Sequence, residues 1–250
     1  MIQKNNNSCL FIGNRDSLGR KTGFGIQKWE DGSKFSTIFN SDQIKGWGIF
    51  IHYDGDIYQG EYLNNITNGY GEYSRQNIVI FKGYWLNDSQ YGIGIEKWND
   101  NSEYDGEYNL GKKEGIGTYT WTDGTTYMGE WKNNHIHGYG ECHYADGKKY
   151  FGYYKLDKKH GFGIFFWPKN KYYIGFWKEG KQNGVAKFIK NNEIKYGVWK
   201  DGKKEKWFKN KEEFIINLNS EDEKYFNLFM WDTNKINEFF DIDIDNEIKD

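Results

Sequence analysis

The amino-acid sequence predicts an all-β fold: an elongated, single-layer antiparallel sheet of about eight 23-residue β-hairpin repeats, followed by a short helical C-terminal cap. Three observations predict it: glycine pairs that recur with a constant period, an aromatic motif with the same period, and a change of composition after Gly202. The chain has 250 residues, of which 31 are Gly, one is Pro and 20% are aromatic. So little Pro excludes a collagen or a Pro-rich linker, and so many aromatic residues exclude a disordered chain.

The glycine pairs have the form Gly-x-Gly, and the spacing from each pair to the next is the same throughout. A fixed period of this kind is the signature of a repeat architecture. We assign these glycines a structural role, because a phosphate-binding loop also needs a helix start and a third glycine. The seven full pairs and one relaxed copy are Gly23-Phe24-Gly25, Gly46-Trp47-Gly48, Gly69-Tyr70-Gly71, Gly92-Ile93-Gly94, Gly115-Ile116-Gly117, Gly138-Tyr139-Gly140, Gly161-Phe162-Gly163 and Gly184-Val185-Ala186.

A second motif, aromatic-x-Gly-x-aromatic, repeats at the same period upstream of the glycine pairs. Its alternation has period two, and glycine inside a helix costs about 1 kcal/mol, so the motif predicts β-strands. The glycines leave room for flat rings to lie over the neighbouring backbone, which explains glycine inside a strand. The six regular copies are Tyr58-Gly60-Tyr62, Phe81-Gly83-Trp85, Tyr104-Gly106-Tyr108, Tyr127-Gly129-Trp131, Tyr150-Gly152-Tyr154 and Tyr173-Gly175-Trp177.

Two kinds of turn join the predicted strands. Asp-Gly pairs are a signal for primed hairpin turns, which need positive φ; they stand at Asp31-Gly32, Asp54-Gly55, Asp123-Gly124 and Asp146-Gly147. The other turn carries, at one repeat position, residues that enter the left-handed region: Asn65, Asp88, Gly111, Asn134, Asp157 and Gly180. Each 23-residue unit is therefore one hairpin, and the hairpins pair edge to edge through sequence-local contacts, without a globular core.

The composition divides the chain into three regions: an N-terminal extension (1–10), the repeat sheet (11–202) and a helical, acidic tail (203–250). The tail has 8 Lys against 13 acidic residues. Ser220 and Glu223 fit a capping box, which predicts a helix over about 221–231 and a second one after Thr233. The apolar side chains of these helices are Tyr225, Phe226, Phe229, Met230, Ile236, Phe239 and Phe240. They either cover the last edge or a face of the sheet, or bind a partner.

The 23-residue unit resembles the MORN repeat (membrane occupation and recognition nexus), as the segment from Tyr127 to Gly147, YMGEWKNNHIHGYGECHYADG, illustrates. The resemblance covers about residues 11–202. Similar proteins made mostly of these repeats act as scaffolds in cilia, basal complexes, myosin complexes and membrane junctions. Elsewhere the repeats accompany lipid kinases and a histone methyltransferase, but the segment after Gly202 is too short for either.

No catalytic or metal site is predicted, so we expect neither enzymatic activity nor a cofactor. His135, His137, Cys142 and His143 fall close together in the sequence, but neighbours on a strand point to opposite faces. Asp241, Asp243 and Asp245 resemble the start of an EF-hand loop, yet Asn246 replaces its required Gly. A net charge of -2 gives no indication of nucleic acid, and two widely spaced cysteines fit free thiols in a reducing compartment.

The centre of each Gly-x-Gly is apolar, so we predict that one face of the sheet presents a long apolar surface that binds a protein partner. The candidate partner-binding residues are Trp47, Tyr70, Ile93, Ile116, Tyr139 and Phe162, with the rings Tyr58, Trp85, Tyr104, Trp131 and Trp177 of the second motif. The glycines that we expect to be structural are Gly69, Gly71, Gly92, Gly94, Gly115, Gly117, Gly138 and Gly140.

The predicted function is a non-enzymatic scaffold or adaptor that holds a helix or an extended peptide of a protein partner. We expect a cytoplasmic location in a cytoskeletal, ciliary or membrane-junction setting. Two alternatives stay open: a peripheral membrane module that binds anionic phospholipid, and the regulatory subunit of a separate enzyme. The open end of a repeat sheet also allows an end-to-end homodimer.

Overall fold

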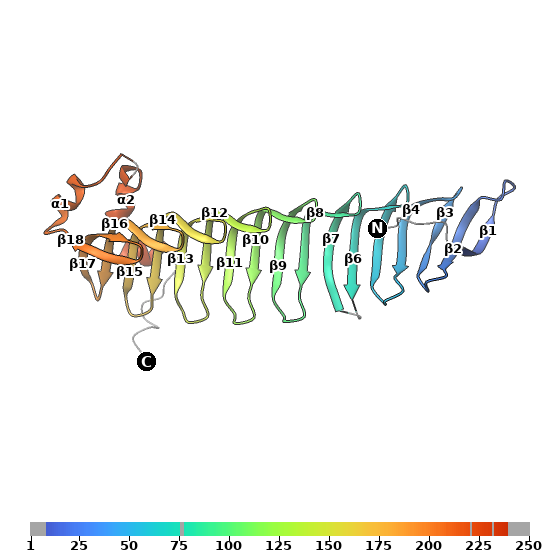
Figure 1. Cartoon of the computed structure of the whole chain (residues 1–250), viewed down its shortest axis with the longest axis horizontal. Helices are drawn as coiled ribbons and strands as arrows, with labels where there is room; N and C mark the ends of the chain where they lie inside the picture. The colour runs from blue at the N-terminus through green and yellow to red at the C-terminus, as the bar shows by residue number, and fades with distance from the viewer. Residues whose placement is uncertain (1–8, 76–77, 221, 232, 240–250) are drawn as a thin grey trace. The chain divides into compact units, whose positions relative to one another are not determined.

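The computed structural model describes residues 9–75, 78–220, 222–231 and 233–239, and it separates the chain into two compact units. Unit 1 comprises Met1–Thr122 and Lys132–Asn134, and unit 2 comprises Asp123–Trp131 and His135–Asp250. Within each unit the strands lie side by side in chain order, joined by tight turns (Figure 1). Phe240 and the three aspartates of the EF-hand-like segment lie outside the described residues.

Unit 1 is an antiparallel meander in which every strand pairs with the next along the chain. Its strands are β1 (Cys9–Arg15), β2 (Lys21–Trp29), β3 (Lys34–Asn40), β4 (Gln43–Ile51), β5 (Ile57–Leu63), β6 (Ile66–Arg75), β7 (Ile78–Leu86), β8 (Ser89–Lys97), β9 (Glu103–Asn109) and β10 (Lys112–Thr120).

Unit 2 continues the same pattern, with antiparallel pairing of successive strands from β12 to β18, and ends in short helices. Its strands are β11 (Thr126–Lys132, whose last residue belongs to unit 1), β12 (His135–His143), β13 (Lys149–Lys155), β14 (Lys158–Trp167), β15 (Lys171–Lys178), β16 (Lys181–Lys190), β17 (Glu193–Lys200) and β18 (Lys203–Trp207). The helices are α1 (Lys211–Ile216), a 3₁₀ turn η1 (Asp222–Tyr225), α2 (Phe226–Phe229) and α3 (Thr233–Phe239).

The described residues thus confirm the predicted all-β class of antiparallel hairpin repeats with a helical C-terminal cap. The strand boundaries differ from the predicted regions at both ends. The first strand starts at Cys9, inside the expected extension, and β18 adds a strand beyond Gly202 that pairs with β17.

Of the two turn predictions, the left-handed residues of the second kind of turn are confirmed, and the primed turn at Asp-Gly is wrong. At Asp31-Gly32 only the glycine is left-handed, with φ of 94°, while the Asp31 side chain accepts a hydrogen bond from the backbone N of Ser33 at 2.8 Å. The prediction of a primed turn at Asp-Gly was therefore wrong, because the aspartate acts through its side chain. The other turns have two successive left-handed residues, as at Asn133 (50°) and Asn134 (69°), which is the primed geometry.

The two glycines of a Gly-x-Gly pair serve different purposes. Gly138 has φ of 61° inside β12, a conformation that side chains disfavour. Gly140 has ordinary strand geometry, but a Cβ there would meet the hydroxyl and ring of Tyr127, the Cε2 carbon at 2.5 Å. The expectation that both glycines face the rings is corrected: only the second one lies under a ring, and a Cβ on the first would meet Glu130.

The first ring of the aromatic motif lies across glycines of its own hairpin, and where this ring is tyrosine its hydroxyl is hydrogen-bonded to a backbone carbonyl. Tyr127 donates from its hydroxyl to the carbonyl of Glu130 at 3.0 Å, and Tyr104 donates to the carbonyl of Glu107 at the same distance. Both rings are fully buried, and burial raises the pKa of the Tyr104 hydroxyl. We call this side of the sheet the glycine face; its edge-to-face ring contacts form a continuous packed layer within each unit.

The C-terminal tail folds back onto the other face of the sheet in unit 2, where the helices lie over the last strands (Figure 1). Phe214 of α1 and Phe229 of α2 are fully buried there, so unit 2 has the globular core that the repeat pattern alone did not predict. The cap before η1 is formed by Asn219 and Asp222, whose side chains each accept the other's backbone N–H at 2.9 and 3.0 Å, rather than by Ser220 and Glu223.

Candidate functional site

The side chains at the centre of each Gly-x-Gly all stand on the face opposite the rings, which we call the row face. In unit 1 Ile93 is 64% exposed and Trp47 is 52% exposed. Cross-strand neighbours extend this surface: Tyr70 packs edge to face against Tyr84, with 5.7 Å between ring centroids. The exposed apolar side chains of the row face in unit 1 include Phe24, Ile38, Trp47, Tyr84, Ile93 and Ile116, and Tyr70 is half-buried.

The second set of candidates does not share this surface. Tyr58, Tyr104, Trp131 and Trp177 are buried on the glycine face, and Trp85 is half-buried there. A partner on the row face cannot touch them, because a strand sends alternate side chains to opposite faces. Their prediction as contact residues for the same partner is therefore corrected: these rings form the packed layer of the sheet.

In unit 2 the row face begins open and then becomes covered. Tyr139 packs against its cross-strand neighbour Tyr153 at 5.8 Å, and both side chains stay exposed. One hairpin further on, Phe162 is only 4% exposed, because Tyr225 stacks on it at 4.3 Å and Phe229 meets it edge to face at 5.5 Å. The tail thus occupies the repeat position that unit 1 leaves open.

The row face also carries carboxylates, which the sequence analysis did not identify as site residues. Glu107 accepts a hydrogen bond from the backbone N of Ile116 at 3.0 Å, and Glu130 accepts one from the backbone N of Tyr139 at 2.7 Å. Each of these acids fixes the backbone at the residue after the left-handed first glycine of a Gly-x-Gly. Their signal was present, since Glu follows the motif glycine at Glu61, Glu107 and Glu130.

The charges around the open rows are paired across strands. Lys82 lies 2.7 Å from Glu72, a hydrogen bond that lowers the pKa of the Glu72 carboxyl. Glu72 also accepts from the Gln59 amide at 3.0 Å. Near Tyr70 the row face thus combines exposed and half-buried apolar side chains with a paired ammonium and carboxylate.

The histidines and Cys142 do not form a reactive cluster. Cys142 is buried, and burial raises the pKa of its thiol. His135 instead contacts Asp157 at 2.6 Å. Across the described part of the chain no three His, Cys, Asp or Glu side chains come together as metal ligands, and no helix there is long and apolar enough to cross a membrane.

The comparison with protein families identifies the repeat. The MORN repeat model matches residues 17–34, 58–77, 104–126, 127–149, 150–172 and 173–193, which together make up half of the chain. The chain therefore belongs to the MORN-repeat family, whose repeat is a non-enzymatic structural unit, and is a repeat scaffold.

Comparisons with curated proteins and with solved structures do not extend the family assignment. A search of curated proteins found no match. Among solved structures, the TCP domain of Drosophila melanogaster SAS-4 (dCPAP), in complex with a proline-rich motif of Ana2 (dSTIL), is 9% identical, with a TM-score of 0.32, 76% of this chain and 90% of that one covered. The TCP10 domain of Danio rerio CPAP is 11% identical, with a TM-score of 0.33 and coverages of 79% and 94%. Likenesses this distant carry no further argument.

Proposed function

We propose that the chain is a non-enzymatic scaffold that binds a helical segment of a protein partner on the open row face of unit 1. One observation carries the proposal: in unit 2 the chain's own apolar helices already cover the same repeat positions. Phe229 and Tyr225 bury Phe162, whereas Ile93, three repeats earlier, stays 64% exposed.

The chemistry of the two surfaces is alike, which supports an amphipathic helix as the occupant. In unit 2 the tail presents aromatic side chains to a row of phenylalanine and valine. In unit 1 Trp47 and the pair Tyr70 and Tyr84 present comparable rings. Aromatic anchors of this kind dominate the free energy of protein binding.

The proposal is tested by photo-crosslinking in native cell extract at physiological salt. A photoreactive amino acid replaces Ile93 on the row face, and in a matched control it replaces Leu110, which is 67% exposed in the turn after β9. We expect one protein to be crosslinked from position 93 and not from position 110. Trp47→Ala combined with Tyr70→Ala should then remove that product, while far-UV circular dichroism shows the sheet intact.

Equal crosslinking from both positions, or an undiminished product in the folded double variant, would contradict the proposal. An extended peptide in place of a helix would be recognised by a crosslinked segment that contains proline or strand-forming residues. We also propose a cytoplasmic setting at a cytoskeletal, ciliary or membrane-junction structure, which the family resemblance alone supports.

A further inference from the structure

One repeat position, two residues after the turn that joins one hairpin to the next, stands at the edge of the glycine-face rings. We call it the post-turn position. In several repeats its backbone N–H donates to an acid or amide of the following turn, as where Asp88 accepts from Thr67 at 2.8 Å and Asn134 accepts from Lys113 at 2.8 Å. The residues at this position are Lys21, Ile44, Thr67, Gln90, Lys113, Ile136, Lys159 and Gln182.

Where the post-turn residue is lysine, its ammonium group enters a cage of aromatic rings. The Lys159 Nζ lies 4.8 to 5.3 Å from the centroids of four rings, which are Tyr144, Tyr150, Phe165 and Trp177. These distances are those of cation–π contacts. The rings shield Lys159 from water, and this burial lowers the pKa of its ammonium group.

A second lysine does the same in unit 1. The Lys113 Nζ lies 4.6 Å from the Trp98 ring, 5.1 Å from Tyr104 and 5.9 Å from Tyr119, and 3.7 Å from a carboxylate oxygen of Glu96. Burial lowers the pKa of Lys113 as well. Two repeats thus share one arrangement: rings on several sides and an ammonium group from the chain itself between them.

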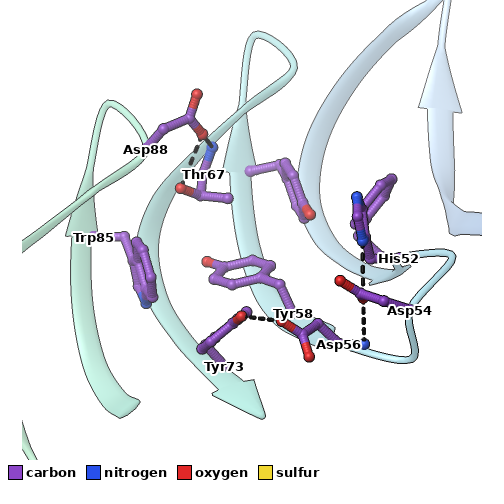
Figure 2. A pocket seen from close by; sticks show the side chains of 10 residues that line it. His52, Asp54, Asp56, Tyr58, Thr67, Tyr73, Trp85 and Asp88 are labelled. Carbon is purple, nitrogen blue, oxygen red and sulfur yellow. Dashed lines mark hydrogen bonds and ion pairs between the residues drawn. The ribbon is translucent and has the colours of Figure 1, made fainter. Parts of the chain in front are cut away.

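The repeat that carries Thr67 has the cage but not the lysine. Counted back by the repeat period, the four rings around Lys159 correspond to His52, Tyr58, Tyr73 and Trp85, and all four line a cavity of about 310 Å³. Figure 2 shows Tyr58, Tyr73 and Trp85 around this space, with Thr67 at its edge. Threonine is too short to fill it, and none of the described residues that line the cavity is a lysine.

Carboxylates give this cavity the charge that suits a cation. Asp88 lines it and uses its Oδ1 to hold both the N and the Oγ1 of Thr67, at 2.8 and 3.0 Å. Asp56 lines it from the other side, where it accepts from the Tyr73 hydroxyl and lies 3.3 Å from Arg75. Burial raises the pKa of the Tyr62 hydroxyl, which also lines the cavity.

We propose that the cavity at Thr67 binds an alkylammonium group supplied from outside the chain, the side chain of a lysine in another polypeptide, in the place where Lys113 and Lys159 put their own. The cavity is on the glycine face, whereas the proposed helix site is on the row face. The two proposals are therefore independent, and either can fail without the other.

The test is isothermal titration calorimetry of the full-length protein at low salt with three probes, a readout that works equally for every variant below. The probes are Nα-acetyl-lysine N-methylamide, n-butylammonium and the uncharged analogue Nα-acetyl-norleucine N-methylamide. We expect the lysine probe to bind saturably and about tenfold more tightly than the norleucine probe, a ratio within the range of desolvated cation–π contacts. A lysine probe that binds more tightly than butylammonium favours a polypeptide over a free amine; equal affinities overturn the polypeptide part of the proposal.

Thr67→Lys tethers an ammonium group in the cavity and should abolish binding of the added probe. Leu110→Lys adds the same charge in the exposed turn after β9, outside the cavity and the row face, and should leave binding unchanged. The reverse change, Lys113→Thr, opens an equivalent cage and should create a second site, which keeps the proposal testable if the Thr67 variant does not fold. Absence of saturable binding to the unmodified protein, or equal binding by Thr67→Lys, would overturn it.

Discussion

The sharpest consequence of the two glycine roles concerns Gly140. A Cβ at this position would lie 2.5 Å from ring carbons of Tyr127, where about 3.5 to 4.0 Å is the normal separation of carbon atoms. The ring cannot retreat without losing its hydrogen bond to the Glu130 carbonyl. Overpacking costs about 1–3 kcal/mol and a lost hydrogen bond about 1 kcal/mol, so Gly140→Ala should lower the free energy of unfolding by about 2–4 kcal/mol.

A matched control separates this crowding from backbone strain. Gly124 has φ of 86°, and a Cβ there would meet nothing within 4 Å. Gly124→Ala should therefore cost only about 1 kcal/mol. Gly124→Asn should be nearly neutral, because Asn101 occupies the same repeat position with φ of 69°.

Urea denaturation, followed by far-UV circular dichroism, measures all three variants. A double-mutant cycle with Tyr127→Leu adds a second criterion, since removing the ring should make Gly140→Ala cheaper by about 1 kcal/mol or more, the size of coupling expected for residues in contact. If Gly140→Ala were no less stable than Gly124→Ala, or if the two changes at 127 and 140 were additive, ring-over-glycine packing would not be the reason for the second glycine.

Three further predictions follow from burial. Phe229→Ala should cost about 3–5 kcal/mol in the tail core and increase hydrogen exchange over 222–231, and unchanged exchange would contradict the assigned contacts with Phe162 and Phe214. Alkylation at pH 8 should modify exposed Cys9 well before Cys142, whose thiol pKa is raised by burial, so equal rates would contradict the buried position. Burial also raises the hydroxyl pKa of Tyr104, Tyr150 and Tyr173 above the unfolded value of about 10, so the folded chain keeps protons that the unfolded chain loses. The free energy of unfolding therefore keeps its full value below about pH 10 and falls as the pH rises further. If tyrosinate absorbance from these residues appeared before the circular dichroism signal was lost, this prediction would be wrong.

The 23-residue period was enough to predict the strands, since two motifs with period two alternate along it. It was enough for the left-handed turns between hairpins but not for the Asp-Gly turns, because Asp and Gly favour several turn types and only the backbone shows that Asp31 acts through its side chain. The site was predicted in part for a similar reason. Periodicity identified Trp47 and Tyr58 as aromatic positions, but the assignment of both to one partner surface neglected that their strands send them to opposite faces.

The sequence also indicates which repeats the tail covers. The indicator is the residue that follows the glycine of the aromatic motif. This residue is the cross-strand neighbour of the row position. In the early repeats it is often glutamate, as at Glu61 and Glu107, whereas it becomes Phe176 and Val198 in the last two.

The carboxylate of a glutamate beside Trp47 or Ile93 needs either water or a hydrogen-bond donor. That part of the row face is therefore either uncovered or faces a partner with a complementary donor. A phenylalanine beside Phe162 has no such requirement, and the tail helices cover it. For the proposed function, the same argument describes the partner: we expect a helix over Trp47 and Ile93 to carry basic or hydrogen-bonding side chains opposite Glu61 and Glu107, together with an apolar stripe. The chain's own tail meets the sheet where the glutamate is replaced, as at Phe176, which Tyr225 contacts edge to face at 5.6 Å.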